Sequence, residues 1–103
     1  MLVADDRVEV EDGIARAPPR LTGLLEVRGL GILRLPHLQS VRLALAVELS
    51  ATPPRLPTQA QHPELGLPLI AIDARSPSAA QRVALALDCV LGRIGQVAGA
   101  FAP

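Results

Sequence analysis

Apolar and polar residues alternate most regularly between Ser40 and Leu49. The apolar set consists of Val41, Leu43, Leu45, Val47 and Leu49. Side chains of a β-strand point alternately to its two faces, so this spacing predicts one strand over 40–49 with a single buried face. A shorter apolar run, Leu67–Ile72, ends at Asp73 and predicts a second buried strand.

The start of the chain predicts short strands and a hairpin. Met1–Ala4 is apolar, stops at Asp5-Asp6, and predicts a buried strand. Val8 and Val10 alternate with charged residues, which predicts a half-exposed strand. Asp12-Gly13 is a strong turn dipeptide, after which Ile14–Arg16 can return as the partner strand. Because a domain seldom opens on a core strand, we expect a segment upstream of Met1 to be missing.

Prolines and glycines divide the middle of the chain. Ala17-Pro18-Pro19 breaks the preceding strand, and the apolar positions of Arg20–Leu25 predict one or two helical turns. Glu26–Gly31 combines two charges with two glycines, a spacing that favours positive φ or a close backbone approach. Thr52–Gly66 is rich in proline and predicts a loop.

The last third of the chain predicts an amphipathic helix over Pro77–Ile94. Apolar residues recur there at helical spacing, and Ser76-Pro77 supplies an N-cap and a first-turn proline. Cys89 falls off the apolar stripe, and we expect the tail from Gly95 onward to fray.

Composition narrows the class of protein. The chain has 103 residues, half of them apolar, which suits one domain over residues 1–103. Its ten basic residues are all arginine and balance ten acidic ones, which argues against a nucleic-acid partner held by bulk charge. The absence of lysine excludes a Schiff-base lysine and a P-loop lysine. A single aromatic residue excludes a base-stacking platform.

The sequence points away from disulfides, metal clusters and membranes. Cys89 is the only cysteine, and His37 and His62 are far apart in the sequence. Charged residues follow Met1 almost at once, unlike a signal peptide, and no apolar run approaches the length of a membrane span. We expect a soluble, cytoplasmic protein without a membrane partner.

Three sets of charged residues are candidates for chemistry. Asp5-Asp6 follows the first predicted strand, where α/β sheets place metal ligands and general bases; the alternative is a pair of solvated turn acids. In an extended segment Glu26 and Arg28 would point the same way and suit Mg²⁺ and phosphate; the alternative is an ion pair. Arg55, in the predicted loop, either binds an anion or is a solvated charge.

The order of these motifs resembles the bifunctional HPr kinase/phosphorylase family. Ala4-Asp5-Asp6-Arg7-Val8 and Ala17-Pro18-Pro19 precede a run that is similar to the family signature. That run consists of Leu24, Leu25, Glu26, Val27, Arg28, Gly29, Leu30, Gly31 and Ile32. The alternating strand, the loop with Arg55 and the C-terminal helix follow in the family's order, in a shortened form like that of the alphaproteobacterial members. The resemblance is most specific between Leu2 and Ile32.

The resemblance implies part of a P-loop α/β kinase core related to phosphoenolpyruvate carboxykinase, with mixed or largely antiparallel strands, a short helix and a C-terminal amphipathic helix. Such enzymes phosphorylate a serine of the HPr phosphocarrier with ATP and Mg²⁺, regulating carbohydrate metabolism through the phosphotransferase system, and can reverse the reaction by phosphorolysis. It implies that Asp6 exchanges a proton with the serine, that Glu26 is a Mg²⁺ ligand and that Arg55 assists dephosphorylation. HPr is the implied partner, and a homo-oligomer is left open.

The chain departs from the family at the nucleotide site. The glycine-rich P-loop with its lysine, and the histidine that precedes it, are absent, and Leu67-Pro68-Leu69-Ile70 replaces an arginine-bearing segment, which argues against phosphorylase activity. We therefore expect the truncated, C-terminal portion of a kinase catalytic domain, inactive alone. The alternative is a non-enzymatic remnant that binds HPr or an intact kinase subunit. Met1–Val3 and Val41–Leu49 are expected to expose apolar surface.

Overall fold

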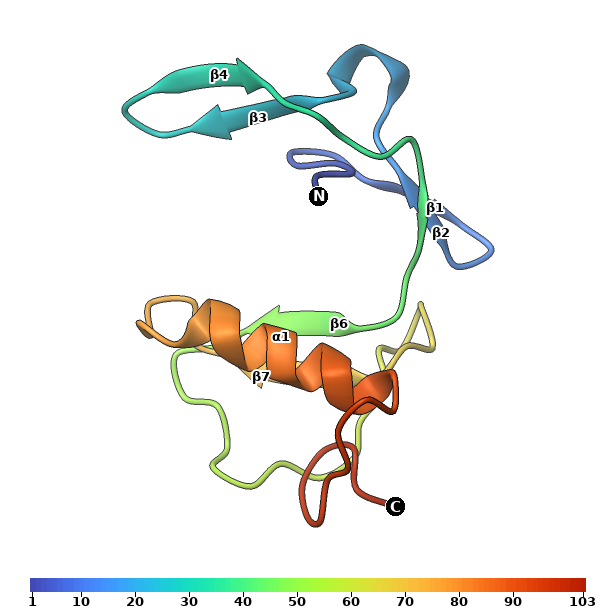
Figure 1. Ribbon diagram of the computed structural model, residues 1–103, viewed down its shortest axis with the longest axis vertical. Helices are drawn as coiled ribbons and strands as arrows, with labels where there is room; N and C mark the ends of the chain where they lie inside the picture. The colour runs from blue at the N-terminus through green and yellow to red at the C-terminus, as the bar shows by residue number, and fades with distance from the viewer. The chain divides into compact units, whose positions relative to one another are not determined.

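The computed structural model describes Met1–Pro103 as a small mixed α/β fold with antiparallel and parallel sheets and one helix near the C-terminus (Figure 1). This confirms the predicted α/β class. The chain divides into two compact units, Met1–Leu43 and Ala44–Pro103, and each is described by itself. The prediction of a single domain over 1–103 stays a prediction.

A three-stranded antiparallel sheet opens the first unit. Its strands are β1 (Glu9–Glu11), β2 (Ile14–Arg16) and β5 (Val41–Arg42), in the order β1-β2-β5. Asp12 and Gly13 join β1 to β2 with φ of 52° and 75°, the double positive φ of a type I′ turn. The predicted hairpin is confirmed, but every residue of β1 is exposed, so the expected half-buried face is absent.

A second hairpin, with a type II turn, carries the signature-like run. It pairs β3 (Leu24–Val27) with β4 (Gly31–Arg34). The Leu30 N–H donates to the Val27 C=O at 2.9 Å, and Gly29 has φ of 82°, which a type II turn demands of its third residue. The predicted positive φ is confirmed here. A close approach is not, because a Cβ at Gly29 would meet nothing within 4 Å.

Only one turn of helix precedes β3. The 3-10 turn η1 covers Pro19–Leu21, so the helical prediction for Arg20–Leu25 is wrong beyond Leu21. The reason is Gly23, whose φ of 77° turns the backbone out of the helix and into β3. Gly23 is also buried, and its C=O accepts a hydrogen bond from the Leu35 N–H at 2.8 Å.

The N-terminal segment is not the buried strand that its composition predicts. Leu2 forms an isolated bridge with His37, and the Leu38 N–H donates to the Leu2 C=O at 2.8 Å. Met1 is 84% exposed, whereas Leu2 and Val3 are half-buried, so the expected exposure of Met1–Val3 holds for Met1 alone. A single bridge gives hydrogen-bond partners to few backbone groups. The segment is therefore attached at Leu2 and does not form a strand of a sheet.

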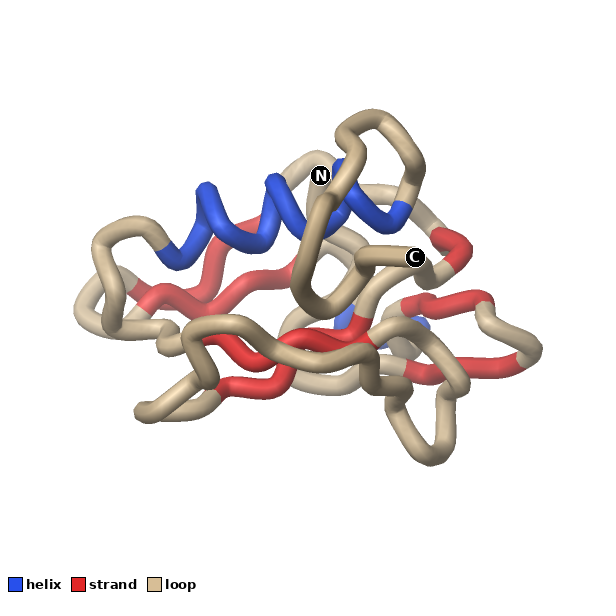
Figure 2. The backbone as a smooth tube through the Cα atoms, turned by 90° about the horizontal axis from the view of Figure 1, so that it is seen from below, coloured by secondary structure: helices blue, strands red, loops and turns tan.

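The second unit is a parallel strand pair with one helix. β6 (Ala46–Leu49) and β7 (Leu69–Ile72) run parallel, and α1 (Ala79–Val90) packs along β7 (Figures 1 and 2). The predicted loop is confirmed, since no helix or strand lies between β6 and β7. Near its end the Ala60 C=O accepts a hydrogen bond from the Leu69 N–H at 3.0 Å.

The long strand predicted over 40–49 is split in two. Val41–Arg42 pairs with β2, whereas Ala46–Leu49 pairs with β7, and the residues between them pair with neither as a strand. The continuous buried face is also wrong, because Val47 is 37% and Leu49 70% exposed. The alternation correctly predicted extended backbone, but the two halves of the segment pair with strands of different sheets.

The helix is shorter than predicted, and the tail after it is folded. α1 covers Ala79–Val90, because Ser76–Ser78 forms a turn before it and Gly92, at φ of 75°, follows its end. Ala86 is its most buried residue, and Cys89 is half-buried and not off the packed face as predicted. The tail does not fray: Ala100 is 5% exposed, and the Phe101 N–H donates to Gln96 Oε1 at 2.6 Å.

Candidate functional site

Asp6 and Glu26 line the same small hollow in the first unit. Its volume is about 110 Å³, and its lining consists of Asp5, Asp6, Leu21, Leu24, Glu26 and Ile32. Two candidate residues that lie twenty positions apart in sequence are therefore brought together by the fold. All three carboxylates are exposed, so a macromolecular substrate can reach them.

The hairpin sets which side chains face this hollow. Residues alternate along a strand, so Leu24 and Glu26 share one face of β3, and Ile32 of β4 lies directly opposite Glu26. These three residues all line the hollow, which places an apolar floor beside the Glu26 carboxylate. The hairpin thus presents Glu26 on one face through ordinary strand geometry.

Asp5 attaches the N-terminal segment to the free edge of β3. The Leu35–Gly23 hydrogen bond and the alternation of an antiparallel ladder direct the Glu26 N–H away from β4. Asp5 Oδ2 accepts a hydrogen bond from this N–H at 3.4 Å. The bond holds the neighbouring Asp6 beside Glu26. Sequence analysis missed this role because Asp5 and Asp6 look equivalent, and only the pairing of β3 shows which amide is left without a strand partner.

The rest of the signature-like run lies on both strands and in the turn. Leu25 and Val27 are half-buried in β3, whereas Leu30 and Ile32 are exposed. Arg28 lies in the turn and not in the strand, so the expected side-by-side presentation with Glu26 is wrong. The alternative of an ion pair is also excluded, since no salt bridge within 4.0 Å joins Glu26 and Arg28.

The size of the hollow limits what it can hold. Water occupies about 30 Å³ per molecule in the liquid, so 110 Å³ fits roughly three or four waters. Pockets for drug-sized ligands have about 300–1,000 Å³. ATP does not fit this hollow, and the chain has no glycine-rich motif with a lysine to hold its phosphates.

The hollow can hold a magnesium ion only if a bound substrate supplies some of the coordinating oxygen atoms. No group of three His, Cys, Asp or Glu side chains gathers in a way that could hold a metal ion. Mg²⁺ keeps several waters and is often held by one or two carboxylates together with substrate phosphates. Asp6 and Glu26 match that partial donor set, whereas a site made of protein ligands alone does not match this structure.

Arg55 lies in the second unit, away from the residues of this hollow along the chain. It lines a different hollow of about 430 Å³, beside Pro53 and Pro54 of the loop, Ile72 of β7 and Arg82 of α1. Neither Arg55 nor Arg82 forms a salt bridge within 4.0 Å. Two guanidinium groups without carboxylate partners suit an anion.

The two histidines and two further aspartates have local structural partners. His62 Nδ1 accepts hydrogen bonds from the Glu64 and Leu65 amides at 3.2 and 3.1 Å, which shapes the loop. His37 packs against Gly23 in the first unit. Asp73 and Asp88 form local ion pairs with arginines that follow them in sequence.

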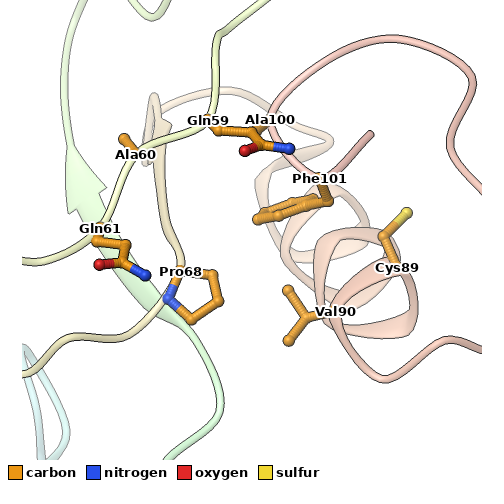
Figure 3. Close-up of a pocket in the computed structure, with 8 residues that line it drawn as sticks. All are labelled: Gln59, Ala60, Gln61, Pro68, Cys89, Val90, Ala100 and Phe101. Carbon is orange, nitrogen blue, oxygen red and sulfur yellow. The ribbon is translucent and has the colours of Figure 1, made fainter. Parts of the chain in front are cut away.

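A larger hollow lies in the second unit and has no charged lining. It measures about 580 Å³ and is lined by Gln59, Ala60, Gln61, Pro68, Cys89, Val90, Ala100 and Phe101. Figure 3 shows Phe101 and Val90 on one side, across from Gln61 and Pro68. The tail is held over it because the Gln59 side-chain amide donates to the Ala102 C=O. Because this hollow has no charged group and the smaller hollow has three carboxylates, we place the candidate site at the smaller hollow.

This folded tail gives a first testable prediction. Replacing Phe101 with alanine removes a half-buried ring, which weakens closure of the tail by about 1–2 kcal/mol. The Cys89 thiol, which shares the hollow, should then react with a thiol reagent roughly 5- to 30-fold faster. Val97→Ala is the control, since Val97 is 99% exposed. An unchanged Cys89 rate in Phe101→Ala would contradict the packing of the tail.

Comparison with known proteins adds no family assignment. No protein-family model matches the chain, and no curated protein has a significant sequence match to it. The helix α1, with its 12 residues, is too short to cross a membrane, and no other helix is long and apolar enough to do so.

Proposed function

We propose that this chain supplies the phospho-acceptor half of an HPr serine kinase-type centre, within a P-loop kinase core whose nucleotide site is provided by other residues. The observation that supports this most is the shared hollow of Asp6 and Glu26. The motif resemblance assigns both residues to the same centre, and sequence distance alone would not bring them together. In this role the chain acts in the cytoplasm, on the HPr phosphocarrier.

Asp6 is the group that handles the proton in this proposal. A serine hydroxyl that attacks the γ-phosphorus of ATP must lose its proton, and a carboxylate within hydrogen-bond reach can accept it. In the reverse direction the same group returns the proton to the serine oxygen. The exposure of Asp6 suits a substrate that is itself a protein, because the serine must be presented on a protein surface.

Glu26 has the charge and position of a metal ligand. Mg²⁺, when bound with a nucleotide, neutralises charge that develops on the transferring phosphate. Glu26 would hold that ion from the face of β3, with its backbone fixed by the Asp5 hydrogen bond. The role of Arg55 in dephosphorylation stays a prediction of the resemblance, because Arg55 belongs to the other unit.

The test links this chain to the P-loop segment that it lacks. A P-loop-bearing piece of an HPr kinase, ending before its own aspartate and signature motif, is linked to this chain by a flexible segment. We expect no phosphoserine on HPr from either part alone with Mg-ATP, and measurable phosphoserine by mass spectrometry from the fusion. HPr with its acceptor serine replaced by alanine is the control. A folded fusion that binds ATP but leaves HPr unmodified would refute the proposal.

A second candidate function is binding without catalysis. Fourteen large apolar side chains are exposed, and they lie in both units. Among them Leu30 and Ile32 of the signature-like hairpin are 70% and 72% exposed, and apolar residues exposed close together mark surfaces that associate with a partner. HPr or an intact kinase subunit would be that partner, and a pull-down with each distinguishes this candidate from the first.

A further inference from the structure

The outer edge of β6 has backbone groups that no strand satisfies. The Ala46 and Ser50 N–H groups donate to the Pro68 and Ile72 C=O groups of the β7 side at 2.9 and 3.0 Å. Backbone groups alternate in direction along a strand, so those of Val47 and Leu49 point away from β7. The sheet has only two strands, and these groups therefore face an open edge.

This edge has little protection against strand pairing. Natural edge strands are protected by charged side chains, prolines, bulges or a covering loop. β6 has the sequence Ala-Val-Glu-Leu, with no lysine and no proline, and Glu48 is its only charged residue. Val47 and Leu49, opposite Ile70 and Ile72 in the register, remain exposed on the same face as these two apolar residues.

We propose that β6 pairs antiparallel with β6 of a second copy of this chain, about a two-fold axis at Val47. The product is a four-stranded sheet in which the two β6 strands lie at the centre and the two β7 strands outside. This inference does not depend on the proposed kinase function. It rests on the hydrogen-bond pattern of β6 and on its sequence.

The register follows from geometry and charge. Centring the pair on Val47 lets its outward N–H and C=O groups bond to those of Val47 in the other copy. Leu49 then lies opposite Leu45, on the same face, and Glu48 lies opposite Ala46. Centring on Glu48 also satisfies the outward groups, but it puts two glutamates opposite each other at about 4.5 Å between Cα atoms. Like charges at that position are destabilising, which selects the first register.

The exposed side chains of β6 favour a second copy as its partner. Val47 and Leu49 are 37% and 70% exposed. In the register centred on Val47, this residue meets its own counterpart and Leu49 meets Leu45, and such cross-strand pairs stabilise an antiparallel sheet. A second copy can therefore cover apolar surface that the chain alone leaves in water.

Amide hydrogen exchange tests this pairing residue by residue. In concentrated samples the Val47 and Leu49 amides should exchange at least tenfold more slowly than in dilute samples, because they gain partners only in the dimer. The Ala46 and Ser50 amides should change much less, since they bond to the β7 side in either state. Sedimentation on the same samples should show dimer converting to monomer on dilution.

A matched pair of variants distinguishes edge pairing from nonspecific apolar association. Val47→Arg should shift the chain to monomer at concentrations where the unmodified protein dimerises, and should remove the protection of the Leu49 amide. Val97→Arg, at a residue 99% exposed, should leave the dimer unchanged. A chain that stays monomeric when concentrated, or a dimer whose Val47 and Leu49 amides exchange fast, would overturn the proposal. Equal effects of the two variants would do the same.

Discussion

Asp6→Asn is expected to lower HPr phosphorylation by the linked P-loop fusion about 100- to 10,000-fold, the usual contribution of a general base. Asparagine keeps the size and the hydrogen-bonding oxygen of the side chain, but it cannot accept the serine proton. The measurement is the initial rate of phosphoserine formation on HPr at saturating Mg-ATP.

Asp5→Asn provides the matched control for this substitution. The two aspartates are adjacent and line the same hollow, but Asp5 uses Oδ2 to accept the Glu26 N–H. An asparagine oxygen can accept the same bond, so we expect most of the rate to remain. If Asp5→Asn and Asp6→Asn reduce the rate equally, the total negative charge of the hollow matters and Asp6 has no special role in proton transfer.

Gly23→Ala is expected to disrupt the first unit. A residue with a side chain at φ of 77° is strained by about 1–2 kcal/mol. In addition, the new Cβ would lie 2.6 Å from His37 Nδ1 and 3.2 Å from the Leu35 C=O oxygen. Overlaps in a packed site cost about 1–3 kcal/mol more. Urea denaturation followed by far-ultraviolet circular dichroism would measure the change in the free energy of unfolding.

Gly29→Ala separates strain from overlap. Gly29 has a similar φ of 82°, but a Cβ there would meet nothing within 4 Å. It should therefore show only the strain of about 1–2 kcal/mol. Equal destabilisation by the two substitutions would mean that His37 moves aside freely, and that Gly23 is required for its backbone conformation alone.

Local signals in the sequence predicted the local structure well. The Asp12-Gly13 hairpin, the loop from Thr52, a strand ending at Ile72 and the presence of the helix all depend on residues close together in the chain. The positive φ of Gly29 and Gly31 was also predicted from residues close together in the chain. These features follow from turn chemistry and periodicity, which need no knowledge of the tertiary structure.

The errors arose where a distant segment decides the outcome. The alternation over 40–49 could not show that β2 takes one half and β7 the other. The apolar composition of Met1–Ala4 could not show that only a single bridge to His37 is available. Arg20–Leu25 was misread because nothing near Gly23 in the sequence shows that its φ is positive or that His37, fourteen residues later, packs against it.

The candidate site was predicted as separate residues and not as an arrangement. Asp6 and Glu26 were chosen for their residue types and for a motif resemblance, and the fold places them at one hollow. The hydrogen bond from the Glu26 amide to Asp5 required the register of β3 and β4, which no periodicity encodes. Arg82 beside Arg55 was missed for a similar reason, because the loop and the helix meet only in the folded unit.

The two attachments of the N-terminal segment restrict how its length can vary. Leu2 is fixed by the Leu38 N–H and Asp5 by the Glu26 N–H, so only Val3 and Ala4 lie between two fixed points. A residue inserted or deleted there would break one attachment and displace Asp6. In the loop between β6 and β7, residues 51–58 form no hydrogen bond to a distant segment, and loops of this kind accept added residues at little entropic cost. Natural length variation and engineered peptide insertions therefore belong in that loop and not in the first six residues.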